Sequence, residues 1–185
     1  MVGIRISKPR KKISKKVTEL SVRLWPDLDE NELWSRHVYD GFTSIPRTMP
    51  IIMNIIDQLS EGSKRTSITY LALWGQAFDE MYVSLQNADE LAFHAGFSGQ
   101  RAVRTWRERL QVLSDLGFIR LASGTSGRFS HAVILNPHFA VRRLRQAKTA
   151  GLTEATYNAL MERGIAISAD DLGMALPEDT PESLV

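Results

Sequence analysis

The residues of this sequence that could do chemistry are mostly arginines. The stretch FSGQRAVRTWRERLQVLSDLGF, residues 97–118, contains four of them, at Arg101, Arg104, Arg107 and Arg109. A guanidinium carries several donors in a planar fork, so it can form a bidentate pair with guanine or hold a phosphate. Because the same stretch has helical spacing, these donors predict contact with a nucleic acid.

Two faces are predicted for a helix over residues 98–116. At about 100° per residue, its apolar side chains fall within one arc and form a stripe that should be buried. This stripe consists of Val103, Trp106, Leu110 and Leu113. The opposite face carries Arg101, Arg104, Thr105 and Glu108. Glu108 can pair with Arg104 four residues earlier, so an ordinary solvated face is the alternative interpretation.

The first turns of this helix hold most of the candidate DNA contacts. A helix that enters a major groove with its N-terminal half places such donors at base edges and phosphates. The residues in question are Ser98, Gln100, Arg101, Arg104 and Thr105. Arg107 flanks the apolar stripe and is better placed for a phosphate.

Catalytic and metal-binding patterns are missing from the sequence. There is no cysteine, and the histidines lie too far apart to suggest a pair of ligands. They are His37, His94, His131 and His138. No GxxxxGK[ST] loop, HExxH pair or GxSxG elbow is present. We therefore expect no enzyme, no metal and no cofactor.

The elements that must position these arginines follow from periodicity and turn residues. Residues 68–86 place Leu71, Trp74, Phe78, Met81 and Leu85 at spacings of three and four, which predicts an amphipathic helix. A short helix is predicted in NADELAFHAG, ending at a glycine. After the long helix, FIRLAS and FSHAVIL have strand character around the turn GTSGR. Together they predict a β-hairpin over residues 119–135.

The segment DELAFHAGFSGQRAVRTWRERLQVLSDLGFI resembles the helix-turn-helix and first strand of winged-helix DNA-binding proteins. Ala92 stands where a small residue lets the two helices cross, and Gly96 where a glycine permits the turn. The third helix of the motif has an apolar residue at a fixed position, and Val103 stands one position later than in the compact form of the motif. The turn between the two helices is therefore one residue longer than in that form. The resemblance covers about residues 68–145 and identifies a superfamily only. It implies a mainly α fold with a small β-hairpin, a winged helix-turn-helix with extra N- and C-terminal helices.

Further contacts are predicted outside the long helix. The hairpin tip presents Thr125, Ser126 and Arg128, which could reach a phosphate or the minor groove, although a plain turn is the alternative. A second basic cluster follows the hairpin, at Arg142, Arg143 and Arg145. A third lies near the N-terminus and includes Lys11 and Lys12. Both clusters could hold phosphates or simply face water.

Composition and charge divide the chain into five segments. We expect a basic flexible arm over 1–20, an N-terminal helical extension over 21–66 and a winged-helix domain over 67–150. A C-terminal helix over 151–166 and an acidic disordered tail over 167–185 complete the plan. The tail could mask the basic face or recruit a partner, because residues 165–185 contain five acids and no base.

The sequence thus predicts a sequence-specific double-stranded DNA-binding protein that acts as a homodimer. A transcriptional regulator and a replication or partition factor are both compatible with it, and the small cysteine-free format suits a plasmid- or phage-borne gene. The alternatives are a winged-helix module for protein assembly and an RNA-binding protein. No apolar run of about eighteen residues is present, so we expect a cytoplasmic protein without membrane contact. No small-molecule effector is indicated.

Overall fold

The structure, a computed structural model of the chain, describes residues 9–60, 65–125 and 127–177. It is mainly helical with one small antiparallel sheet. The chain divides into two compact units, Met1–Phe42 and Thr43–Val185. Within the described ranges, every helix is too short or too polar to cross a bilayer.

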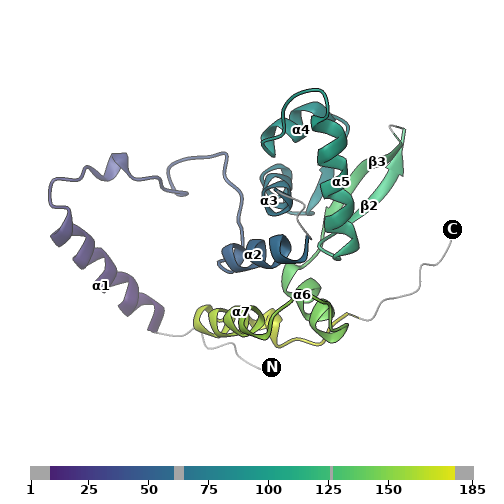
Figure 1. Cartoon of the computed structure of the whole chain (residues 1–185). Coiled ribbons are helices and arrows are strands. Elements are labelled where there is room, and N and C mark those ends of the chain that lie inside the picture. The colour runs from purple at the N-terminus through teal and green to yellow at the C-terminus, as the bar shows by residue number, and fades with distance from the viewer. Residues whose placement is uncertain (1–8, 61–64, 126, 178–185) are drawn as a thin grey trace, which may run out of the picture. The chain divides into compact units, whose positions relative to one another are not determined.

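The first unit contains helix α1 (Pro9–Leu24) and the 3-10 turn η1 (Glu30–Glu32) (Figure 1). The flexible arm predicted over residues 1–20 is therefore wrong from residue 9 onward, while residues 1–8 lie outside the described part. A proline at the first helical position favours the start of α1. Apolar residues then recur at spacings of three and four, at Val17, Leu20 and Leu24, which is a helical period. The many lysines of this segment made that period hard to recognise in the sequence.

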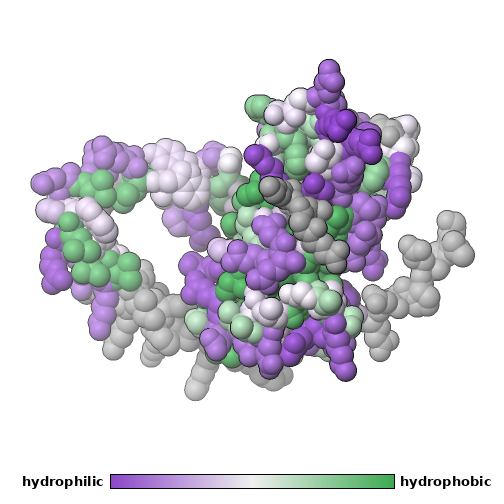
Figure 2. All heavy atoms as spheres, in the orientation of Figure 1, coloured by the Kyte–Doolittle hydropathy of each residue, from purple (hydrophilic) through white to green (hydrophobic). Residues whose placement is uncertain are grey.

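The first unit has almost no core of its own. The large apolar side chains that the structure describes in this unit lie at the surface, where they appear as green patches among hydrophilic residues (Figure 2). Among them are Val17, Leu20, Val22, Leu24, Trp25, Leu33, Trp34, Val38 and Phe42. Within this unit, Trp34 packs edge-to-face on Phe42 at 5.8 Å between ring centroids. The folding free energy of the chain must therefore come mainly from the second unit.

The described residues of the second unit form six α-helices. They are α2 (Met49–Leu59), α3 (Thr66–Gln76), α4 (Ala88–His94), α5 (Ala102–Asp115), α6 (Pro137–Gln146) and α7 (Glu154–Ile167). Helix α2 packs against α3 and α7, with Ile52, Ile55 and Ile56 completely buried. The sequence placed α2 in the N-terminal extension, but its apolar face belongs to the core of this unit.

A three-stranded antiparallel sheet completes the second unit. The strands are β1 (Tyr82–Ser84), β2 (Ile119–Gly124) and β3 (Gly127–Ile134), in the order β1-β3-β2. Ala132 of the central strand is paired with Val83 on one side and with Leu121 on the other. The hairpin predicted over residues 119–135 is confirmed. The edge strand β1 is an addition that the sequence did not predict.

The helix predicted over residues 68–86 is wrong in its second half. Helix α3 ends at Gln76, Ala77 is extended, and Phe78 is 82% exposed instead of lying in the core. Met81 then turns the chain through a left-handed conformation with φ of 56°. Residues 82–84 pair with β3, and β-branched and aromatic residues such as Val83 and Tyr82 suit that environment. Sheet pairing thus overrides a helical spacing that continues in the sequence.

The core of the second unit holds α5 in place. Trp106, Leu110 and Leu113 of α5 are at most 1% exposed, and Val103 is partly buried, so the predicted apolar stripe is confirmed. Each buried large apolar side chain contributes about 1.5–3 kcal/mol to stability. This anchoring leaves the opposite face of α5 in water.

The acidic tail predicted to be disordered over 167–185 is partly folded. Helix α7 continues to Ile167, and a 3-10 turn η2 (Asp170–Leu172) follows. Leu172 is buried against Gly164, where an added Cβ would overlap its Cδ1 atom. The segment is described as far as residue 177, and residues 178–185 lie outside the described part. The folding of this segment could not be predicted from the sequence, because it depends on one buried leucine that belongs to no periodic pattern.

Candidate nucleic-acid interface

The turn between α4 and α5 is set by a glycine and two small residues. Gly96 has φ of 78°, a left-handed conformation that costs glycine little. Ala92 and Ala95 are fully buried, which lets the two helices approach closely. The Nη1 atom of Arg65 donates a hydrogen bond to the carbonyl oxygen of Gly96 and ties the turn to the start of α3.

Three predicted contacts lie in this turn and not in the helix. Helix α5 begins at Ala102, so Ser98, Gln100 and Arg101 precede it, and all three are exposed. The helix boundary predicted at residue 98 is therefore wrong by one turn. The three residues stand next to the N-terminus of α5, and a helix N-terminus favours anions.

The outward face of α5 carries the remaining predicted contacts of the helix. Arg104 and Arg107 are exposed, and Thr105 is half-buried. The Nε atom of Arg104 lies 3.2 Å from the Oε1 atom of Glu108, as the spacing of four residues predicted. The Arg104 side chain is nevertheless 81% exposed, and such a surface ion pair contributes less than about 1 kcal/mol. Its guanidinium can therefore exchange partners readily.

The hairpin supplies one arginine close to this face. Arg128 is exposed near the start of β3, with its guanidinium carbon 5.7 Å from the centroid of the Phe129 ring. This stacking holds a long side chain in one place. Thr125 is exposed at the tip, and Ser126 lies outside the described residues.

A shallow hollow of about 360 Å³ connects α5 with the hairpin. It is lined by Arg104, Arg107, Glu108, Gln111, Arg128 and Phe129. Hydrophilic side chains gather around α4 and α5 at the top of the unit (Figure 2). The structure thus brings together three arginines that the sequence predicted separately. Gln111 and Phe129 were missed, because nothing in their spacing shows that the hairpin folds over the helix.

The basic cluster of α6 is engaged within the protein. Arg142 donates a hydrogen bond from Nη1 to the carbonyl oxygen of Met174, and Arg143 donates from Nη2 to that of Pro177 at 3.2 Å. Arg145 lies 3.9 Å from a carboxylate oxygen of Glu154. In this structure, the three side chains do not line the hollow beside α5. To hold phosphates, as the sequence predicted, these arginines would first have to leave these partners.

Lys11 and Lys12 lie in α1, which belongs to the first unit. Their side chains are outside the described part of the structure. The prediction that they contact phosphates therefore stays a prediction.

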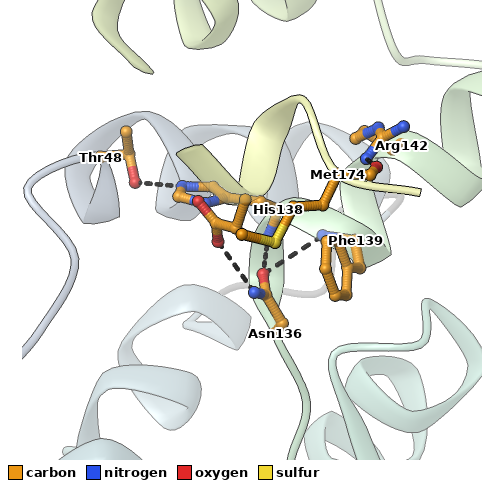
Figure 3. A network of polar contacts seen from close by, with 7 residues as sticks. Thr48, Asn136, His138, Phe139, Arg142 and Met174 are labelled. Carbon is orange, nitrogen blue, oxygen red and sulfur yellow. Dashed lines mark hydrogen bonds and ion pairs between the residues drawn. The ribbon is translucent and has the colours of Figure 1, made fainter. Parts of the chain in front are cut away.

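A buried polar network links three distant segments, and the sequence did not reveal it (Figure 3). His138 is 4% exposed; its Nδ1 atom lies 2.7 Å from Oδ2 of Asp171, and its Nε2 atom 2.6 Å from Oγ1 of Thr48. Asn136 donates to the same carboxylate at 2.8 Å and caps α6 by accepting from the backbone of His138 and Phe139. The network fastens the starts of α2 and α6 to η2.

The electrostatics of this network favour an ionised Asp171. Partial burial opposes ionisation, but hydrogen bonds from Asn136 and His138 and the charge of His138 outweigh it, so the pKa of Asp171 lies below its ordinary value. The order hydroxyl, imidazole, carboxylate is also that of a nucleophilic relay. Since Thr48 is completely buried, a substrate carbonyl cannot reach its hydroxyl group. The network therefore acts as a clasp between segments.

Comparison of the chain with models of protein families, with curated proteins and with solved structures finds no match.

Proposed function

We propose that residues 66–134 form a winged helix-turn-helix that binds double-stranded DNA in a sequence-specific manner. The order helix, strand, helix, helix, strand, strand supports this proposal, since α4 and α5 follow one another across a tight turn and the hairpin returns beside α5. In this arrangement α5 is the recognition helix and the β2–β3 hairpin is the wing.

The observation that carries the proposal is the convergence of arginines around one exposed hollow. Arg104 and Arg107 come from α5, and Arg128 comes from the hairpin. None of them belongs to the core, to which α5 contributes its opposite face. A basic face on a rigid helix, flanked by a hairpin, suits a major groove and the adjacent phosphate backbone.

Each residue then has a distinct role in the proposed complex. Arg104 and Thr105 read base edges, while Arg107 and Arg128 hold phosphates on either side of the groove. Ser98, Gln100 and Arg101 meet the backbone at the start of α5, where the helix N-terminus adds favourable charge. A homodimer would read two such half-sites.

The biological setting belongs to the same proposal. A cytoplasmic regulator of transcription and a replication or partition factor of a plasmid or phage would both use this interface. An assembly module that binds protein is a second candidate, supported by the exposed apolar side chains of the first unit. The two candidates differ in whether α5 discriminates between DNA sequences.

Arg104→Ala tests the proposed recognition helix. A duplex is first enriched from a random pool by the purified full-length chain at physiological salt. Loss of a base contact should weaken binding of this duplex by about 5- to 150-fold, or about 1–3 kcal/mol, and reduce the preference over a scrambled duplex. Fluorescence anisotropy measures both affinities, and circular dichroism verifies the fold.

Arg120→Ala is the matched control, because Arg120 is exposed on β2 and does not line the hollow. It should change both affinities by less than about 2-fold, as expected of a surface substitution at the base of the hairpin, away from the hollow. If Arg104→Ala and Arg128→Ala each bound the enriched duplex as tightly as the unchanged chain, α5 and the hairpin would not form the interface.

A further inference from the structure

We infer that Arg142 and Arg143 of α6 form a second site for DNA backbone phosphates, and that the C-terminal strap, residues 168–177, occupies this site in the structure. The inference rests on the proposed function, since it names a second part of the DNA surface and a means of regulating it. It concerns backbone phosphate alone and adds no base contact.

The hydrogen bonds that the strap accepts from the two arginines are weak compared with a phosphate contact. Arg142 donates to the carbonyl oxygen of Met174 and Arg143 to that of Pro177, both of which are neutral acceptors. A hydrogen bond between two charged groups is about twice as strong as one to a neutral group. Exchange of these carbonyl groups for phosphate oxygens is therefore favourable once the strap leaves.

The charge of α6 suits such a ligand. Its sequence, PHFAVRRLRQ, contains three arginines and no acid. Arg145 is held by Glu154 and also stacks over the Tyr157 ring at 5.3 Å, so both of its contacts come from α7 and would remain. Arg142 and Arg143 both donate hydrogen bonds to the strap, so release of the strap changes the surroundings of these two.

The position of α6 extends the proposed interface in one direction. Helix α6 lies below α5, past the end that leads into β2 (Figure 1). A helix of fourteen residues is about 21 Å long, so a ligand that touches the start of α5 and also α6 has to be extended. A duplex, with a charge about every 1.7 Å along its axis, satisfies this requirement.

The strap is buried near Asp171 and Leu172 and exposed beyond them. Asp171 contacts His138 and Asn136, and Leu172 is buried at 5% exposure. Farther along, Met174 is 54% exposed, so the part that covers the arginines has little apolar attachment. Asp170 and Asp171 also place negative charge beside α6, which repels phosphate. Loss of the clasp should therefore free the site and remove repulsion together.

The double variant Asp171→Asn/Leu172→Ala tests this inference in the full-length chain. With the strap released, binding of a random-sequence duplex at low salt should tighten several-fold. The slope of log K against log salt should become steeper by up to about 1.8, since each phosphate contact adds about 0.9. Adding Arg142→Ala and Arg143→Ala to the released chain should return the slope to that of the unchanged protein.

Asp170→Asn is the matched control, because it changes the charge equally at an exposed neighbouring residue. Hydrogen exchange of the amides of residues 168–177 reports strap release directly, and the single variant Leu172→Ala serves if the double variant does not fold. Released amides with an unchanged slope would overturn the inference. An equal gain in Asp170→Asn would also overturn it, since charge alone would then explain the effect.

These outcomes are separable from a failure of the proposed function. If no duplex is preferred over a scrambled one and strap release still steepens the slope, the phosphate site on α6 stands without sequence-specific recognition by α5. If Arg104→Ala loses the preference for the enriched duplex while strap release leaves the salt slope unchanged, recognition by α5 is supported and the phosphate site on α6 is refuted.

Discussion

At the scale of single residues, the role of an arginine depends on the partner that folding gives it. Arg104 meets Glu108 in water, where the ion pair is weak and a ligand can replace it. Arg142 and Arg143 reach backbone carbonyl groups of a segment more than thirty residues away. The sequence could predict the first case from a spacing of four residues. It could not predict the second, since no local pattern indicates where the C-terminal segment folds.

The buried clasp predicts a specific pH dependence of stability. Asp171 has a lowered pKa, so its ionised form stabilises the folded state above its ordinary pKa of about 4. This contribution should be constant near neutral pH and disappear as the pH falls below about 4 through the folded-state pKa. Urea unfolding of the unchanged chain and of Asp171→Asn, from pH 7 to pH 3, measures the difference.

The expected result is a positive difference in the free energy of unfolding at pH 7 that shrinks toward pH 3. Asp170→Asn serves as the control, since it removes an equal charge without contacting His138. A difference that stays constant over the whole range would show that the ionised carboxylate does not stabilise the clasp.

At the scale of elements, local patterns in the sequence predicted the helices and the hairpin well. They predicted poorly the residues at which these elements begin and end. The stripe of α5, the hairpin and the glycine at the α4–α5 turn follow from periodicity and turn residues, and all are confirmed. Strand β1 was missed because it lies between Met81 and Leu85, which continue a helical spacing. The hollow beside α5 was missed too, since it depends on how the hairpin packs over the helix.

Gly117 offers a test of the turn that leads from α5 into the hairpin. It has φ of 77°, and an added Cβ would meet nothing within 4 Å, so Gly117→Ala changes the backbone energy alone. A left-handed alanine costs about 1–2 kcal/mol, and the variant should be less stable by that amount in urea unfolding.

Gly75→Ala is the control for this substitution. Gly75 lies within α3, is equally open and has no positive φ, so alanine should stabilise the protein by about 0.5–1 kcal/mol. Equal effects of the two substitutions would contradict the assigned role of Gly117 as the turn after α5.

At the scale of the whole molecule, the chain separates a unit with a packed core from one with surface apolar groups. The second unit buries most of its large apolar side chains, whereas those of the first unit remain exposed. Charge asymmetry indicated the basic beginning and acidic end, but not that α1 is helical or that the strap folds back. The helical structure of α1 and the folding of the strap both depend on a few apolar residues within strongly charged segments.

The central claim is that the whole protein discriminates between DNA sequences through α5. Its most direct test is the ratio of dissociation constants for a scrambled duplex and for one enriched from a random pool, both measured with the full-length chain at physiological salt. Sequence-specific proteins reach ratios of about 10³ or more, and we expect at least this value. A ratio near 1 at every salt concentration, or no binding of either duplex, would contradict the account.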